Sequence, residues 1–232
     1  MREYSIIMMD LNGLKTVNDN IRDACMRAGR NPDEVHLIAV SKFKPVEDIS
    51  EAYNAGQREF GENHVKEMLD KEILLPKDIK WHMIGHLQTN KLKMVLPYAS
   101  LIHSIDTVRL LEAVDKAAGA SGRHIPCLLE VHISKDETKQ GFSFDEVMDL
   151  SRHFSDYPNV IFKGVMGMAS LTDDMDRVRC EFRSLKNLSE RIYAQSPEFC
   201  EISMGMSGDY PIAVEEGSTI VRIGSKIFGK RN

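Results

Sequence analysis

The feature that most constrains the fold is a repeated alternation of short apolar runs with stretches of helical periodicity. The runs are rich in Val, Ile, Leu and Met, as strands buried on both faces of a parallel sheet are. Alternation of this kind is typical of parallel βαβ units. The expected strands are 36–42, 57–63, 81–85, 101–106, 126–133, 160–168, 201–206 and 219–228.

Eight such units fit a closed (β/α)8 TIM barrel. An additional amphipathic helix precedes them, with apolar positions from Leu11 to Ala28 and a stop at Gly29. So few residues follow the eighth strand that no helix is expected there, and the opening helix can cover the gap. A doubly wound open sheet would bring a glycine-rich fingerprint after the first strand, which Ser41-Lys-Phe-Lys44 does not resemble.

Composition and length narrow the class of protein further. The 232 residues carry no linker-like stretch, so we expect one α/β domain over 1–232, in which residues 1–10 extend the first helix or fray. The net charge of −5 argues against a nucleic-acid partner. Four scattered cysteines, no leader and no membrane-length apolar run indicate a reduced, cytoplasmic protein with no membrane partner, which we expect to be a monomer.

Function in such barrels gathers at the carboxyl ends of the strands, and phosphate sites are frequently built by the loops after strands seven and eight. Here those two loops hold small residues with accessible backbone N–H groups or hydroxyls, which suit a phosphate. The sequence therefore predicts a phosphorylated ligand. The residues concerned are Gly205, Ser207, Gly208, Gly224 and Ser225.

Lys42 and Arg222 stand at apolar strand ends and each has two interpretations. Lys42 either extends out of the barrel rim or is a partly desolvated amine that forms a Schiff base with a carbonyl. Arg222 either meets a planar polar ligand group or forms an internal ion pair with a carboxylate such as Glu130. Asn63 either caps a helix or lines the pocket.

His82 and His86 have a spacing that invites a metal site. They straddle a strand end, however, and no third ligand is evident. We expect partnered or exposed histidines and no metal site.

Five motifs in this order resemble the pyridoxal phosphate homeostasis protein family, from about residue 11 to the end of the chain. Together they are highly specific, although any one alone is weak. They are Ala39-Val-Ser-Lys-Phe-Lys-Pro45, Phe60-Gly-Glu-Asn63, Trp81-His-Met-Ile-Gly-His-Leu-Gln-Thr-Asn-Lys91, Met204-Gly-Met-Ser-Gly-Asp209 and Gly217-Ser-Thr-Ile-Val-Arg-Ile-Gly-Ser-Lys-Ile-Phe-Gly229.

The resemblance implies a barrel similar to the N-terminal domain of alanine racemase. It implies that Lys42 holds pyridoxal 5′-phosphate as a Schiff base and that Arg222 faces the pyridine nitrogen. Ser207, Gly224 and Ser225 would hold the phosphate, and Asn63 would line the pocket. The implied role is handling of the cofactor in vitamin B6 homeostasis, with apo forms of pyridoxal-phosphate enzymes as further partners. The N-terminal ten residues match nothing in the family, and Pro211 leaves the shape of the loop after Ser207 open.

An arginine at the pyridine nitrogen keeps that nitrogen unprotonated, because arginine does not release its proton. Most enzymes of this cofactor use an acidic partner instead, which strengthens the electron sink. We therefore expect a protein without robust catalysis. Racemisation needs a second acid/base group, which alanine racemase takes from a tyrosine of a second domain that is not expected here. The alternatives are a racemase-like enzyme and a barrel enzyme for another phosphorylated metabolite.

Overall fold

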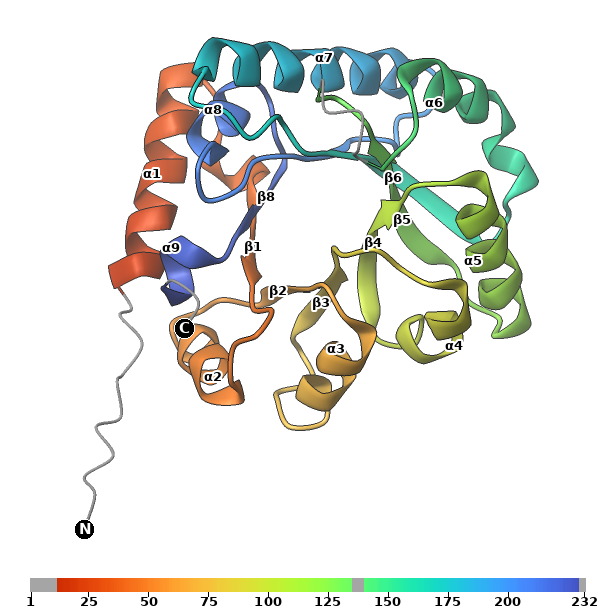
Figure 1. Ribbon diagram of the computed structural model, residues 1–232, viewed down its shortest axis with the longest axis horizontal. Coiled ribbons are helices and arrows are strands. Elements are labelled where there is room, and N and C mark those ends of the chain that lie inside the picture. The colour runs from red at the N-terminus through yellow and green to blue at the C-terminus, as the bar shows by residue number, and fades with distance from the viewer. Residues whose placement is uncertain (1–11, 135–139, 230–232) are drawn as a thin grey trace.

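The structure is a computed structural model that describes residues 12–134 and 140–229, so the expected extension at 1–10 lies outside the described residues. Eight parallel strands form a closed barrel in chain order, and β1 pairs with β8 to complete it (Figure 1). The prediction of an α/β barrel is confirmed. The strands are β1 (His36–Val40), β2 (Glu59–Glu62), β3 (Lys80–Met83), β4 (Ala99–Ile105), β5 (Ile125–Val131), β6 (Val160–Gly167), β7 (Glu201–Ser203) and β8 (Ile220–Ile223).

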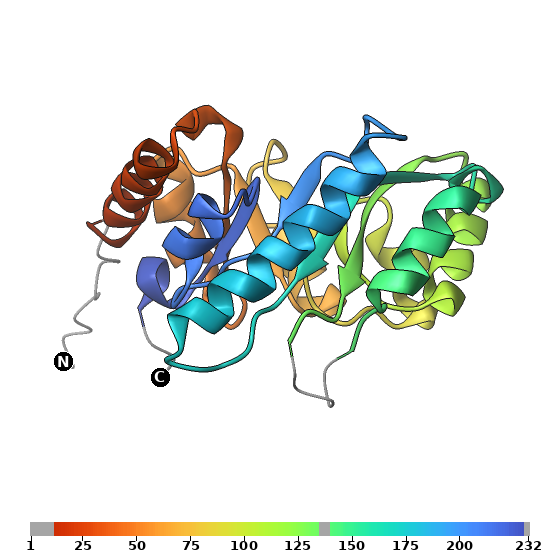
Figure 2. The same cartoon turned by 90° about the horizontal axis from the view of Figure 1, so that it is seen from above.

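Helices surround the barrel, as Figures 1 and 2 show. Their apolar stripes pack against the outer faces of the strands in one continuous core. None of those in the described ranges is both long and apolar enough to cross a bilayer. The helices are α1 (Asn12–Ala28), α2 (Val46–Asn54), α3 (Val65–Glu72), α4 (Leu92–Val95), α5 (Val108–Ala120), α6 (Phe144–Leu150), α7 (Met175–Tyr193), α8 (Tyr210–Glu215) and α9 (Ser225–Phe228).

The opening helix α1 covers the barrel beside β8, as the sequence predicts. It lies against α8 and α9 (Figure 1). A Cβ at Gly13 would lie 2.4 Å from the carbonyl oxygen of Lys226, so this close approach requires glycine. Gly29 ends the helix with φ 66°, a left-handed conformation that glycine adopts without strain.

Two predictions at the end of the chain are wrong. Residues 219–228 are not one strand, because β8 ends at Ile223 and a short helix, α9, follows where none is expected. The amide groups of Ile227 and Phe228 both bond back to the carbonyl of Gly224, and both side chains are buried. A short apolar run does not distinguish a strand from a buried helical turn.

The turn before α8, whose shape the sequence leaves open, ends with Asp209 in the N-cap position of that helix.

A separate apolar cluster fills the barrel interior toward the amino ends of the strands. Side chains alternate along a strand, so the residue two places further also points inward. The next inward-facing layer, nearer the carboxyl ends of the strands, therefore contains charged and polar side chains. Ligands bind at this end of such barrels. The cluster consists of Ile38, Leu101, Leu128, Met166 and Ile220, and the residues two places on are Val40, His103, Glu130, Met168 and Arg222.

Candidate functional site

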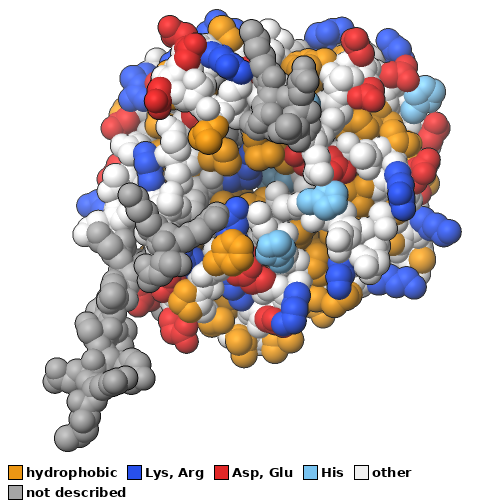
Figure 3. Space-filling view, viewed as in Figure 1, with side chains coloured by type: hydrophobic (Ala, Val, Ile, Leu, Met, Phe, Trp, Pro, Cys, Tyr) orange, Lys and Arg blue, Asp and Glu red, His pale blue; other side chains and the backbone are white. Residues whose placement is uncertain are grey.

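A cavity of about 340 Å³ opens at the carboxyl ends of the strands. Figure 3 shows a hollow at the centre of this face with basic side chains inside it. The cavity brings together all the residues that the family resemblance implies for the site, and Gly208 as well, but Gly205 does not line it. The implied residues are Lys42, Asn63, Ser207, Arg222, Gly224 and Ser225, and Val40, Ile84, Met168 and Met206 supply apolar walls.

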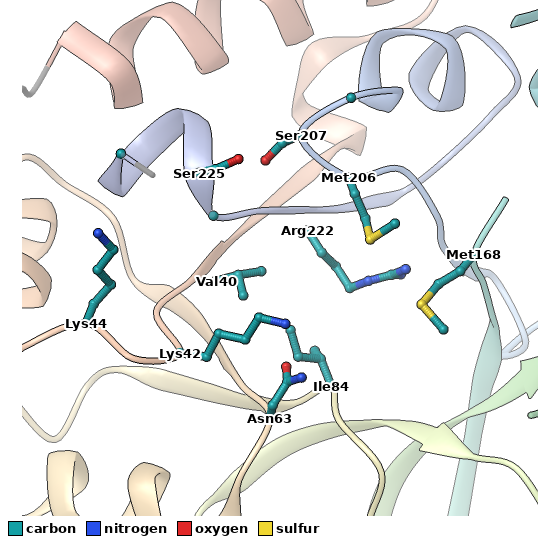
Figure 4. A pocket seen from close by; sticks show the side chains of 13 residues that line it. Val40, Lys42, Lys44, Asn63, Ile84, Met168, Met206, Ser207, Arg222 and Ser225 are labelled. Atoms are coloured by element: carbon teal, nitrogen blue, oxygen red, sulfur yellow. The ribbon is translucent and has the colours of Figure 1, made fainter. Parts of the chain in front are cut away.

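Lys42 is half-buried and points across the cavity rather than out of the rim (Figure 4). It follows the inward residues Ile38 and Val40 at the same two-residue spacing. The next residue, Phe43, has φ 62°, which is strained for a bulky side chain. Its amide donates to Glu67 Oε1 at 2.5 Å. The chain therefore turns sharply just after the lysine, and a helix residue holds that turn.

A buried ionic cluster lies next to Lys42. Lys71 of α3 donates to Glu62 Oε1, Glu67 Oε1 and the Ser41 carbonyl at 2.7, 2.7 and 2.8 Å. Ser41 Oγ donates to the same Glu62 oxygen at 2.6 Å. Burial raises the pKa of Glu62, while the hydrogen bond from Lys71 lowers it. This ionic cluster ties the end of β1 to β2 and α3, and so fixes the backbone that carries Lys42.

Asn63 reaches the cavity from the end of β2. His64, not Asn63, occupies the N-cap position of α3, so the prediction of Asn63 as a helix cap is wrong. A Cβ at Gly85 would lie 2.5 Å from the Asn63 carbonyl oxygen. The bare backbone of Gly85 therefore allows Asn63 to sit close to the end of β3.

The two loops after β7 and β8 meet at the opposite end of the cavity from Asn63. Figure 4 shows the hydroxyls of Ser207 and Ser225 directed toward one another. Within 12–134 and 140–229, the backbone N–H groups of Ser207, Gly208 and Ser225 have no acceptor. A Cβ at Gly224 would lie 3.1 Å from the Val40 carbonyl oxygen. This end of the cavity offers bare donors and suits an anion.

Arg222 is buried and lies across the cavity toward Met168 (Figure 4). It donates to the carbonyl oxygen and Oγ of Ser203 and to the carbonyl oxygen of Gly167. Burial lowers the pKa of Arg222 to about 10, which still leaves it charged at neutral pH. In the described residues no carboxylate lies within ion-pair distance of it. The predicted alternative of an ion pair with Glu130 is therefore wrong.

Glu130 nonetheless faces the same interior. Burial and Asp106 raise the pKa of its carboxyl to about 7, and Arg222 acts in the opposite direction. Asp106 itself pairs with His86 at 3.1 Å at the rim. A second hollow of about 590 Å³ lies beside that pair and contains none of the predicted site residues.

The two histidines singled out by spacing have separate environments. His82 is buried and contacts His103 at 2.9 Å, whereas the His86 side chain is 55% exposed. The part of the chain that is described contains no group of three residues suited to hold a metal.

Several residues of the site lie outside the sequence predictions. Ser203 and His103 lie in the barrel interior behind Arg222. The sequence does carry a signal for His103, because it lies two residues after the inward-facing Leu101 on β4. Glu62 and Lys71 support Lys42, and a lysine on a helix carries no signal that predicts its burial.

The chain matches known proteins over nearly its whole length. The family model described as alanine racemase, N-terminal domain, matches residues 13–232. A protein of Vibrio alginolyticus named pyridoxal phosphate homeostasis protein is 38% identical, and the match covers 94% of this chain and 96% of that protein.

Two solved structures show the same barrel. One is described as an unknown protein from Bifidobacterium adolescentis, with TM-score 0.90, 32% identity and 94% of each chain covered. The other is PipY of Synechococcus elongatus with pyridoxal phosphate bound, with TM-score 0.79, 35% identity, and 92% of this chain and 100% of that chain covered. The chain belongs to the pyridoxal phosphate homeostasis protein family, within the wider group that shares the alanine racemase N-terminal domain.

Proposed function

We propose that this protein binds pyridoxal 5′-phosphate through Lys42 and acts in handling that cofactor inside the cell, without robust catalysis. The observation on which the proposal rests is the cavity itself. One amine, one buried guanidinium and a set of bare backbone donors converge on it from different strands. Membership of the pyridoxal phosphate homeostasis protein family supports it, and so does 35% identity to PipY, which has been solved with this cofactor bound.

The residues present fit the chemical groups of the cofactor. Lys42 suits the aldehyde, the loops at Ser207 and Ser225 suit the phosphate, and Arg222 suits an acceptor atom on the ring edge. When bound, pyridoxal phosphate supplies an aldehyde and an electron-withdrawing ring. Lys42 Nζ, as the free amine, would form the C=N bond with loss of one water molecule.

Arg222 supports a carrier role over a catalytic one. Among the described residues its hydrogen-bond acceptors are neutral groups of Ser203 and Gly167, and it donates without accepting. It would therefore leave a ring nitrogen unprotonated, which weakens the electron sink that demanding amino-acid chemistry needs.

The racemase-like alternative requires an acid/base group on the far side of the ligand from Lys42. The cavity lining contributed by the described residues contains no tyrosine, histidine or cysteine. Tyr210, which follows the cavity-lining residues Ser207 and Gly208 in the sequence, is fully buried. Its hydroxyl accepts a hydrogen bond from Asn20 at 2.8 Å. This environment favours the carrier hypothesis. Apo forms of pyridoxal-phosphate enzymes are the proposed recipients.

Borohydride reduction followed by peptide mass mapping tests the proposal. Purified protein incubated with pyridoxal phosphate should show a visible absorption band that reduction removes, and the mass adduct should map to Lys42. Lys42→Ala should lose the adduct and keep the fold. Lys44→Ala is the matched control, because Lys44 lines the same cavity but its Nζ donates to the Phe228 carbonyl at 2.5 Å. An adduct at Lys44 or Lys226 would overturn the assignment.

A further inference from the structure

A row of buried polar side chains crosses the barrel interior behind Arg222. Ser203 Oγ lies 2.5 Å from Arg222 Nη1 and 2.9 Å from His103 Nδ1. His103 Nε2 lies 2.9 Å from His82 Nδ1. Ser203 and His103 are fully buried, and His82 is 6% exposed. The proposed function uses Ser203 only as a hydrogen-bond acceptor for Arg222 and gives His103 and His82 no role.

The hydrogen bonds in this row have a defined direction. Arginine only donates, so Ser203 Oγ accepts from it, and the serine proton is left for His103 Nδ1. His103 then carries its proton on Nε2 and donates to His82 Nδ1, which places the His82 proton on Nε2. The opposite direction would leave both the serine proton and the acceptor atom His82 Nε2 without partners among the described residues, whereas the first leaves only the proton on His82 Nε2 without one. The first direction therefore satisfies more groups.

The row ends at a second cavity of about 230 Å³ at the amino ends of the strands, which His82 lines. His82 Nε2 is buried and has no hydrogen-bond partner in the described residues. The row therefore connects the upper cavity, through the barrel centre, to the opposite end.

Both imidazoles are neutral at neutral pH. Burial lowers the pKa of His82 to about 4. Burial also holds the pKa of His103 well below its usual value, and the neighbouring His82 ring and the Arg222 guanidinium act in the same direction. The row therefore holds Arg222 by hydrogen bonds without cancelling its charge. A carboxylate in the same place would pair with the guanidinium and neutralise it.

The contacts also fix the orientation of the guanidinium. Nη1 donates to Ser203 on one side, and Nη2 donates to the Gly167 carbonyl at 3.2 Å. The Nε–H group and the second Nη2 hydrogen make no hydrogen bond within the described part of the chain. These groups belong to a residue that lines the upper cavity, so they are the donors that a ligand can meet.

We propose that Ser203, His103 and His82 are positioning residues, whose one-directional hydrogen-bond row aims the remaining donors of Arg222 at an acceptor atom on the ring edge of the ligand. The ligand part of this inference rests on the proposed function. The direction of the row is a property of the protein alone, and the two can be tested separately.

Histidine nitrogen NMR on the ligand-free protein tests the direction. Both His82 and His103 should be in the Nε2–H form and remain neutral from pH 6 to pH 8, since the pKa of His82 is about 4. A spectrum with an Nδ1–H form at either residue, or with an imidazolium in that range, would overturn the row as described. This result does not depend on whether the cofactor binds.

Affinity for two ligands tests the positioning. The probes are pyridoxal phosphate and its carbocyclic analogue, which keeps the aldehyde and phosphate but has CH in place of the ring nitrogen. Wild-type protein should prefer pyridoxal phosphate by roughly tenfold or more, as expected for a hydrogen bond from a charged donor. His103→Phe and Ser203→Ala should reduce that preference to less than about twofold.

Leu101→Val is the matched control, because Leu101 lies two residues before His103 on the same inward face. It should lower the affinity for both ligands equally and leave the preference for pyridoxal phosphate unchanged. If the variants of the row behave like Leu101→Val, their role is packing and the positioning proposal fails. If wild-type protein forms no adduct at Lys42, the proposed function fails instead, and the NMR result still decides the direction of the row.

Discussion

Removal of the buried lysine next to the site should destabilise the protein by an amount that can be worked out in advance. Lys71→Met leaves Glu62, whose side chain is fully buried, without its cation. At pH 7, protonating a carboxyl of ordinary pKa 4.5 costs about 3.4 kcal/mol, from 2.5 pH units at about 1.36 kcal/mol each. Because Glu62 can become neutral by taking up a proton, this cost is the upper limit of the stability that the variant loses through electrostatics.

The lost hydrogen bond to the Ser41 carbonyl adds about 1 kcal/mol. The expected loss is therefore about 3–4 kcal/mol, in the range seen when one partner of a buried pair is removed. For a chain of this size it corresponds to a fall in Tm of roughly 6–16 °C. Because Ser41 precedes Lys42 directly, affinity for the cofactor should fall as well.

Urea unfolding followed by circular dichroism at pH 7 and pH 5 measures the effect. In the variant, folded Glu62 binds a proton that the unfolded chain releases above pH 4.5, so the loss grows as pH rises. The difference from wild type should shrink by up to about 2.7 kcal/mol between pH 7 and pH 5. Lys66→Met is the control, because Lys66 pairs with Asp70 on the same helix but its side chain is 86% exposed. It should leave the stability essentially unchanged.

The double variant Glu62→Gln/Lys71→Met removes both charges and should recover much of the loss. A loss below about 1 kcal/mol for Lys71→Met, or one that does not depend on pH, would refute the electrostatic account.

Three further predictions concern ligand binding, acid stability and chemistry. Ser225→Ala should weaken pyridoxal phosphate binding roughly 10- to 150-fold. Gly224→Val should weaken it more, because a Cβ at this position would lie 3.1 Å from the Val40 carbonyl oxygen. A titration that shows equal affinity for pyridoxal and its phosphate would contradict the phosphate site. Burial raises the pKa of Glu59, but hydrogen bonds from His36 and Lys80 outweigh it and lower the pKa to about 2. Glu59 therefore stabilises the fold above pH 4.5 and loses that contribution as pH falls toward 2, so Glu59→Gln should unfold more readily at pH 7 and approach wild type in acid melts. Loaded protein incubated with L- or D-alanine in deuterated water should show slow α-proton exchange, and fast racemisation abolished by Lys42→Ala would favour the enzyme.

The fold could be predicted because alternation of strand and helix leaves few architectures, and because apolar runs such as 36–42 mark buried parallel strands. The convergence of Lys42 and Arg222 followed from the rule that strand ends meet at one face. The boundary at Gly224 could not be predicted, since Ile227 and Phe228 suit a strand or a helical turn equally. The partners of Arg222 lie on β7 and β6, at Ser203 and Gly167, and residues distant in sequence give no local signal of such contacts.

The closure of the barrel by β1 and β8 has a consequence for biosynthesis. Lys42 emerges early, but the strand that pairs with β1 and the loop that holds Ser225 are made roughly 180 residues later, about 10–40 s at ordinary translation rates. Until then the lysine is an ordinary amine on an open sheet edge. If Lys42 binds the ligand as proposed, specific loading requires the finished barrel, and a chain cut short before β8 would carry Lys42 without the Ser225 end of the cavity.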